Sequence, residues 1–453
     1  MTQPTPVAGE FCSADDSTNR ARGEFTDLFD RGAIAGLERN LVPDPRVSVF
    51  TNDNGRETGY AVSADPARSV EAFLAITLHG TLDSGEAVTL LHAQNHGGAG
   101  WLPEYRAAVA VLGDHIVDDQ LFTAVRFRMD HPAWLAHLSD AQTCRVGDDG
   151  STLTVQASEA NDNWLVYESS KPVTLRQIEI RAVSGCLALL QLALYTDDDR
   201  TVCETQVRIG PTSPWLAVHG TGFCSERGSR EHETLLPASQ LTIERYAAWI
   251  ALHTKLDGLT WVVARPFNGA VQTRVLLLTT LIEGFHRATD DHNQDKFPDA
   301  EKAALRRIGA AARTAAKVQA SEEAIDENTV ERAVVFYTEV SYRERAQAIV
   351  SDVYSVVPEV VESINDPSSR ILKARNYLAH QLKEDDGHSF EARVLEWLIV
   401  ANTLSWLLRC FLLLRAGIDP AVLRERLLQI QRFGFFRANN AQHARELGWT
   451  LPG

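Results

Sequence analysis

The strongest constraint on the fold is a change in hydrophobic periodicity about halfway along the 453-residue chain. Before about residue 235, apolar and polar residues alternate in short runs, which is typical of strands with one buried face. After residue 241, apolar residues recur every three or four positions, which is typical of amphipathic helices. Residues 225–237 between these halves are rich in turn-forming residues. The sequence therefore predicts an α+β protein with a β-rich front half and an all-helical back half.

Short alternating runs, separated by clusters of Gly, Asn and Asp such as 52–55 and 147–150, predict the strands of the front half. The clearest runs are 46–50, 87–91, 124–128, 153–157 and 177–181. We expect antiparallel sheets over residues 25–235, arranged as a sandwich or as a pair of sheets, with the strand order left open. Residues 1–24 are mostly small or polar, and we expect a flexible N-terminus there.

Two histidines of the front half have a spacing that would suit a metal site on a helix. His92 and His96 are four residues apart, so they would share one helical face. Glycines follow directly at Gly97 and Gly98, which favours a loop, and no third ligand is nearby. We therefore predict a mobile loop and no bound metal.

Long amphipathic segments joined by short connections predict an antiparallel helical bundle over residues 241–453. A strand-like run at 259–263 interrupts them. The most apolar stretch, 394–414, contains charged and amide side chains and is predicted to be a buried bundle helix rather than a membrane span. The expected helices are 241–256, 271–288, 298–318, 329–353, 358–364, 367–382, 390–416 and 420–432.

The net charge of −16 is concentrated in the front half, where residues 1–240 carry −15 and residues 241–453 carry −1. An acidic surface repels nucleic acid, so any contact with RNA is expected in the back half. The N-terminus lacks the basic start and apolar run of a signal peptide, and the six scattered cysteines lack metal-ligand spacing. These features favour a cytoplasmic protein with reduced thiols and no membrane association.

The stretch from Arg375 to His380 is the most informative about chemistry. In a helix over 367–382, Arg375 projects into an apolar stripe, where a guanidinium needs a carboxylate or phosphate partner. Asn376 and His380, four residues apart, share another face. The stripe consists of Ile371, Ala374, Leu378 and Leu382.

Two carboxylates of the back half are candidate partners for Arg375. Glu283 lies in the largely apolar run 276–285, and a lone acid on a buried helix usually has a partner. Glu396, in the next helix, is the second candidate. A purely structural ion pair would explain either arrangement, just as His380 would be explained as an ordinary surface histidine.

This run resembles the Arg-polar-x-x-x-His signature of HEPN domains, in particular those of ApeA-like abortive-infection proteins. Asn376 supplies the polar residue directly after Arg375, and four residues separate Arg375 from His380. The run lies late in the helical region and precedes one long apolar helix, as in that family. The front half resembles the β-rich N-terminal region that accompanies such HEPN domains.

The resemblance implies a metal-independent endoribonuclease of an anti-phage abortive-infection system, which needs no cofactor and leaves 2′,3′-cyclic phosphate ends. His380 would transfer protons, and Arg375 would stabilise the negative charge of the phosphorane. Asn376 would orient His380 or the phosphate, and Tyr377 would assist at the edge of the cleft. The resemblance also implies a homodimer, in which two copies of the motif face one cleft.

We expect the acidic N-terminal domain to regulate the nuclease rather than hold RNA, because its charge of −15 disfavours contact with phosphate and exposed loops on a β-sheet commonly recognise protein. A phage protein is the expected trigger. The alternative is a non-catalytic HEPN-like bundle that retains the motif for folding or dimerisation, in a protein that acts as a binding or sensor module. Experiments that replace Arg375 or His380 separate these two functions.

Basic and aromatic residues interleave near the C-terminus, in a pattern that combines attraction to phosphate with base stacking. Arg432 and Arg437 flank the aromatic run 433–436, and Lys373 precedes the motif by two residues. These three cations are our candidates for contacts with RNA. The phenylalanines of 433–436 would equally be explained by packing on the bundle.

Overall fold

A computed structural model describes most of the chain, which divides into two compact units, residues 1–254 and 255–453. We describe each unit separately. The described residues are 5–41, 47–51, 57–62, 74–96, 103–129, 134–157, 163–194, 202–224, 234–265, 267–289, 296–297, 301–323, 339–379 and 389–449.

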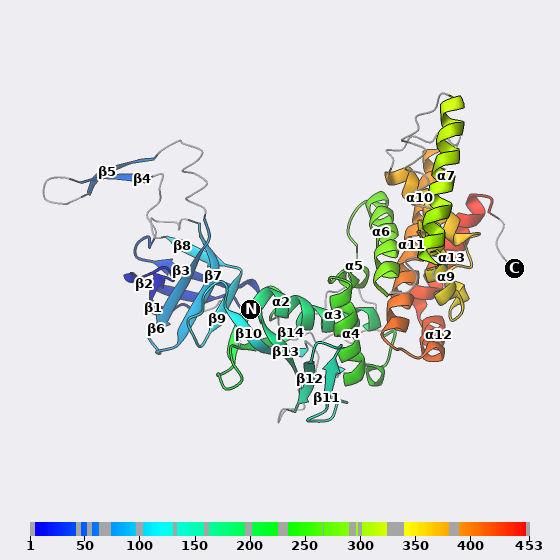
Figure 1. Ribbon diagram of the computed structural model, residues 1–453. Coiled ribbons are helices and arrows are strands. Elements are labelled where there is room, and N and C mark those ends of the chain that lie inside the picture. Colours follow the sequence, from blue (N-terminus) through cyan, green and yellow to red (C-terminus); the bar gives the residue numbers. More distant parts are fainter. Residues whose placement is uncertain are drawn as a thin grey trace. The chain divides into compact units, whose positions relative to one another are not determined.

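The front unit is built on one antiparallel sheet of thirteen strands, which confirms the predicted antiparallel β architecture (Figure 1). The strand order is β11-β12-β13-β10-β14-β15-β9-β7-β6-β1-β2-β3-β8, and β4 pairs with β5 in a separate hairpin. The strands are β1 (Val7–Ser13), β2 (Asp16–Asp27), β3 (Ala33–Leu37), β4 (Val47–Thr51), β5 (Glu57–Val62), β6 (Ile76–Leu82), β7 (Ala87–Asn95), β8 (Glu104–Ala107), β9 (Val109–Leu112), β10 (Leu121–Met129), β11 (Thr143–Val146), β12 (Ser151–Gln156), β13 (Trp164–Thr174), β14 (Val202–Arg208) and β15 (Leu216–Gly220).

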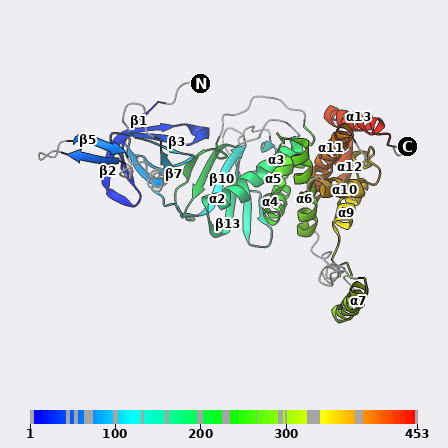
Figure 2. The same cartoon turned by 90° about the horizontal axis from the view of Figure 1, so that it is seen from above.

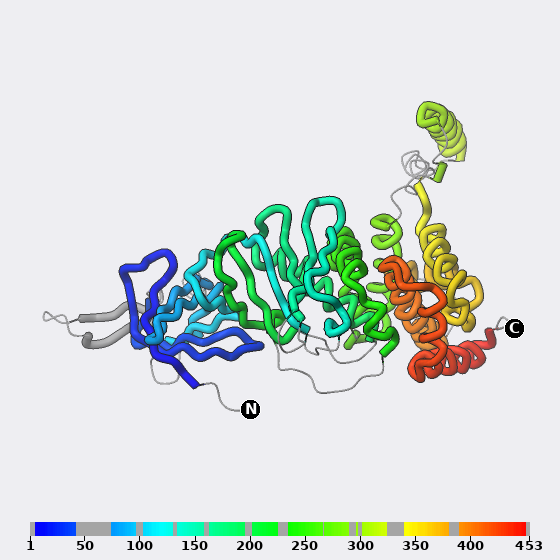
Figure 3. Tube along the Cα trace, turned by 90° about the horizontal axis from the view of Figure 1, so that it is seen from below, coloured from blue at the N-terminus to red at the C-terminus, as the bar shows by residue number. Residues whose placement is uncertain are grey.

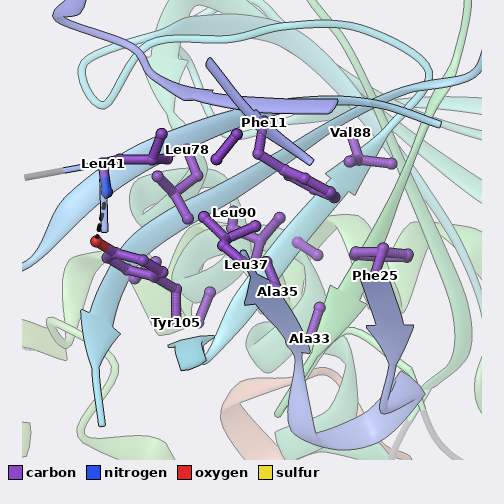
Figure 4. Close-up of a cluster of buried hydrophobic side chains, with 14 of the residues drawn as sticks. Phe11, Phe25, Ala33, Ala35, Leu37, Leu41, Leu78, Val88, Leu90 and Tyr105 are labelled. Atoms are coloured by element: carbon purple, nitrogen blue, oxygen red, sulfur yellow. Dashed lines mark hydrogen bonds between the residues drawn. The ribbon is translucent and has the colours of Figure 1, made fainter. Parts of the chain in front are cut away.

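Six of these strands close into a ring, because β7 pairs with β8 as well as with β6 and β9. The ring encloses a buried cluster that includes Phe11, Phe25 and Leu37 (Figure 4). The Tyr105 hydroxyl satisfies the backbone N–H of Leu41 at 3.3 Å at the edge of this cluster. The other strands extend from β7 through β9 as an open sheet.

Two predictions for the front unit are wrong. The polar segment 1–24 contains β1 and most of β2, which pair with each other; β1 also pairs with β6, so these residues belong to the ring. The run 177–181, predicted as a strand, lies in a helical segment formed by α2 (Leu175–Ile178) and the π-helical turn Glu179–Ser184. Thr174 caps this helix in a capping box with Gln177, which fixes the helical start.

The helical segment continues into α3 (Gly185–Leu194), all of whose residues are buried. Helix α4 (Ile243–Lys255) contacts it: the Trp249 indole N–H donates to the carbonyl of Gly185 at 2.7 Å, and His253 bonds the carbonyl of Ile180 at 3.1 Å. Because of these contacts α4 belongs to the front unit, so the domain boundary lies near residue 255 and not at residue 241 as predicted.

The back unit is a helical bundle, as predicted, and α11 packs against α5, α6, α9, α10 and α13 (Figures 1 and 3). Fourteen of the residues of α11 are buried, and 78% of its most apolar window lies inside the structure. Such burial is typical of a core helix. The helices are α5 (Thr260–Ala264), α6 (Val271–Thr289), α7 (Lys302–Glu322), α9 (Tyr342–Tyr354), the 3₁₀ turn Pro358–Val360, α10 (Pro367–Ala379), α11 (Phe390–Arg415), α12 (Pro420–Gln429) and α13 (Gln431–Glu446).

Among the residues that the structure describes, two helical segments are long and apolar enough to span a membrane, Leu175–Leu194 and Phe390–Arg415. In both segments most of the apolar window is buried within the protein, 72% in the first and 78% in the second. Their composition is therefore explained by their place in the two protein cores.

Three element boundaries in the bundle differ from the predictions. The strand-like run 259–263 falls in α5, because it packs on α11 as a helix. Of the helix expected over 329–353, residues 329–338 lie outside the described residues, and α9 begins at Tyr342, where Ser341 and Glu344 form a capping box. The helix expected over 420–432 ends at Gln429, and the basic and aromatic segment after it forms a separate helix, α13.

Candidate functional site

Arg375 lies on α10, which packs against α6 and α9. Its guanidinium carbon is 4.6 Å from the centre of the Tyr342 ring, and its Nη2 is 3.7 Å from Oε2 of Glu283. The Arg375 side chain is 31% exposed. The guanidinium is therefore held on one face by an aromatic ring and still reaches solvent.

Glu283 interacts with two arginines at the same time. Its Oε1 accepts a hydrogen bond of 2.8 Å from Nη2 of Arg287, one turn along α6, while its Oε2 is the atom nearest Arg375. Of the two predicted partners for Arg375, Glu283 is the one that the structure places beside it. Glu396 pairs instead with Arg370 at 3.0 Å. The carboxylate nearest Arg375 is therefore shared with a second guanidinium.

Tyr342 is the residue that positions Arg375 from α9. Its hydroxyl donates a hydrogen bond of 2.9 Å to the carbonyl of Thr279 on α6, which fixes the plane of the ring. Burial raises the pKa of Tyr342 far above its ordinary value, against the lowering effect of the nearby Arg375. The phenol therefore stays neutral and keeps donating to Thr279.

Another arginine near the site, Arg345 on α9, is buried and only 1% exposed. Its Nη1 donates to Nδ1 of the buried His286 at 3.2 Å, and its Nε donates to the carbonyl of Val340 at 3.2 Å. Burial lowers the pKa of Arg345, and the charge of Arg287 adds to this effect. Because Arg345 donates to Nδ1, that nitrogen of His286 carries no proton.

The remaining residues of the motif divide between faces of α10. Asn376 is half-buried and follows Arg375 on the helix. Tyr377 is buried: its hydroxyl accepts a hydrogen bond from Nη1 of Arg393, and its ring lies 5.9 Å from that of Trp397. Tyr377 therefore packs on α11, and its role at the edge of the cleft stays a prediction. His380 lies outside the described residues.

The three candidate RNA-binding cations have different surroundings. Lys373 and Arg432 are exposed, on α10 and α13 respectively. Arg437 is held in a two-pronged pair with Glu362, at 2.6 and 2.8 Å, so its charge is already compensated. Near it, Phe433 and Phe436 pack on Trp406, with ring centroids 5.0 and 6.0 Å away. Packing on the bundle therefore explains these two phenylalanines.

The predicted loop at His92 and His96 is in part a strand. His92 lies within β7 with its side chain exposed and a φ of 52°, and His96 directly follows the strand. Gly97 and Gly98 lie outside the described residues. Across the part of the chain that the structure describes, no three His, Cys, Asp or Glu residues gather closely enough to hold a metal ion.

Sequence reasoning missed Tyr342, Arg287, Arg345 and His286. The spacing of Glu283 and Arg287, four residues apart on one helix, was a usable signal for an ion pair. The contacts of Tyr342 and Arg345 with α6 carry no such signal, because they join helices about 60 residues apart in sequence.

Comparison with known protein families agrees with the two-unit architecture. Residues 9–175 match the family described as ApeA N-terminal domain 1, and residues 276–421 match the family described as Apea-like HEPN. The second match covers α6, α9, α10 and α11, and with them Arg375, Glu283 and Tyr342. No curated protein and no solved structure matches the chain. The chain therefore belongs to the ApeA-like proteins and carries a C-terminal HEPN domain.

Proposed function

We propose that this protein is a metal-independent endoribonuclease of a cytoplasmic anti-phage abortive-infection system. The observation that carries the proposal is the setting of Arg375 in the HEPN domain. Its guanidinium is anchored on Tyr342, remains 31% exposed, and shares its only carboxylate among the described residues with Arg287. An exposed guanidinium whose carboxylate is 3.7 Å away can be approached by a phosphate.

The proposed reaction is attack of the RNA 2′-hydroxyl on the adjacent phosphorus, which expels the 5′-oxygen of the next nucleotide. A base must take the proton of the 2′-hydroxyl, and an acid must supply a proton to the leaving oxygen. His380 is assigned to proton transfer because an imidazole changes its charge near neutral pH. Arg375 is assigned to stabilise the negative charge of the phosphorane. Asn376 is assigned to orient His380 or the phosphate by hydrogen bonding. The test is cleavage of assorted RNAs by the purified protein in the presence of EDTA.

Dimerisation follows from the geometry of the motif. Residues five apart on a helix diverge by roughly 140°, so Arg375 and His380 of one copy make a thin active site. We expect a homodimer through the helical unit, in which two motifs share one cleft. Sedimentation at micromolar concentration should give twice the chain mass of 50.1 kDa. A monomer that cleaves RNA at the full rate would rule out the shared cleft.

Regulation by the front unit predicts the behaviour of a truncated protein. The fragment that begins at Lys255, the boundary between the units, should still bind RNA, because the charge of −15 lies almost wholly before it. We expect cleavage by this fragment to lose its response to the trigger, for which a phage protein is our candidate. Filter binding measures the affinity for RNA, and circular dichroism checks the fold. A folded fragment without affinity for RNA would contradict this division of roles.

One observation favours a second function. Arg375 has a carboxylate neighbour, Glu283, and an aromatic neighbour, Tyr342, within the bundle, as a purely structural arginine would. In that case the HEPN domain is a non-catalytic module for binding, sensing or dimerisation. Replacement of Arg375 then changes stability and leaves RNA intact, and this outcome separates the two functions.

A further inference from the structure

Helix α7 (Lys302–Glu322) differs from the other long helices of the bundle. Only Gly309 and Ala320 of its 21 residues are buried, whereas α11 buries most of its length. Figures 2 and 3 both show α7 standing clear of α9, α10 and α11. The helix therefore contributes little to the core.

Cations gather on one side of α7. Lys302, Arg306 and Arg313 follow at intervals of four and seven residues, which keeps them within about 40° of one another around the helix axis. Arg307 follows Arg306 and lies about 100° further around the axis. The row of three is about 16 Å long, with steps of about 6 and 10 Å. We call these four residues the α7 basic face.

The α7 basic face is not compensated in the way that other cations of the unit are. In the bundle, arginines pair with carboxylates at 2.6 to 3.0 Å, as Arg370 does with Glu396, Arg415 with Asp352 and Arg437 with Glu362. Within the described residues, Lys302, Arg306, Arg307 and Arg313 form no ion pair with any carboxylate. Four uncompensated cations on a surface helix attract a polyanion.

The rest of α7 argues against a membrane or a second copy of the chain as its partner. Helices that lie on membranes present Trp, Phe and Leu, whereas the apolar side of α7 is mostly alanine. Its exposed larger residues are Ile308 and Val318, each 57% exposed. Contact between two α7 basic faces would bring like charges together.

We propose that the α7 basic face binds the phosphates of RNA and so holds the substrate of the HEPN domain. The identity of this polyanion as substrate rests on the proposed ribonuclease function. The charges and their spacing come from α7 alone. An extended single strand fits this row best, because cations spaced along about 16 Å of helix contact successive phosphates without reading bases.

The test uses the full-length protein and a single-stranded RNA of about 20 nucleotides, a length that exceeds the row of cations. Each nucleotide carries a 2′-O-methyl group, so binding is measured without cleavage. The variant carries Lys302→Gln, Arg306→Gln, Arg307→Gln and Arg313→Gln, which remove charge and keep helix-forming side chains. Because each phosphate contact adds about 0.7 to the salt slope for single strands, the slope should become shallower by about 2.8. Raising salt fourfold should then weaken wild-type binding about 50-fold more than variant binding.

The matched control keeps all four positive charges and exchanges only the side chains that carry them, with Lys302→Arg, Arg306→Lys, Arg307→Lys and Arg313→Lys. It should bind RNA with the wild-type salt slope. Equal affinity and slope for the wild type and the glutamine variant would overturn the inference. Undetectable RNA binding by the wild type would overturn it too, as would tighter, α7-dependent binding to phosphatidylserine vesicles. A wild type that binds this RNA through α7 but cuts no natural RNA would refute the ribonuclease function and the role of RNA as its substrate, and would uphold the binding of RNA phosphates by α7.

Discussion

His380→Ala is expected to abolish RNA cleavage while the fold stays close to wild-type stability. Removal of a group that transfers protons in the transition state costs about 10²- to 10⁴-fold in rate. The spacing of the sequence sets His380 apart from the stripe of Ile371, Ala374 and Leu378, so its removal should cost about 1 kcal/mol or less. Cleavage is measured on labelled RNA with EDTA present, and thermal melting measures stability.

The chemistry of the products tests the mechanism separately from the residue. Attack by the 2′-hydroxyl leaves 2′,3′-cyclic phosphate ends, which wild-type protein should produce in EDTA. Full activity of purified His380→Ala would refute the catalytic assignment. Cleavage that depends on Mg²⁺ would refute the mechanism, even if His380 proved essential, because a metal-bound water would then be the plausible nucleophile.

Local patterns predicted most elements, and the failures have physical causes. Strands such as β10 and β12 follow from alternation, since mainly one face of each is buried. The closure of the ring through β7 and β8 does not follow, because only two residue pairs join these strands. Alternation over the five residues 177–181 also led to a wrong prediction of a strand in a helical segment. The capping box of Thr174 and Gln177 was the signal that favours a helix there.

A similar signal was available for α9. Ser341 and Glu344 form a capping box, which marks the start of the helix more sharply than the hydrophobic pattern does. The domain boundary was harder to predict. Helix α4 is as amphipathic as a bundle helix, and only its contacts with Gly185 and Ile180 assign it to the front unit.

The part of the candidate site that lies on one helix, the motif on α10, was predictable from the sequence. The motif itself and the preference for Glu283 over Glu396 came from sequence, and the structure places Glu283 3.7 Å from Arg375. The aromatic support from Tyr342 and the buried pair of Arg345 with His286 depend on how α9 packs on α6. The catalytic role of His380 stays a prediction, because that residue lies outside the described part of the chain.

Arg345 and Arg375 are expected to have opposite mutational effects, although both lie near Glu283. Arg345→Met should lower the free energy of unfolding by roughly 2–5 kcal/mol, because two buried acceptors, His286 Nδ1 and the Val340 carbonyl, lose their donor. Methionine fills most of the volume, so a cavity adds little to this cost. Urea unfolding measures the change, and cleavage should persist below the lowered melting temperature.

Arg375→Met should leave stability within about 1 kcal/mol of the wild type, because Glu283 is 31% exposed and keeps its hydrogen bond to Arg287. Cleavage should fall about 10²- to 10³-fold, since the phosphorane loses its cation. A loss of several kcal/mol in Arg375→Met, with no RNA cleavage by the wild type, would instead favour the non-catalytic bundle. If Arg345→Met were stable but inactive, the reacting phosphate would be expected to contact the buried arginine, which requires the α9 surface to open when RNA binds.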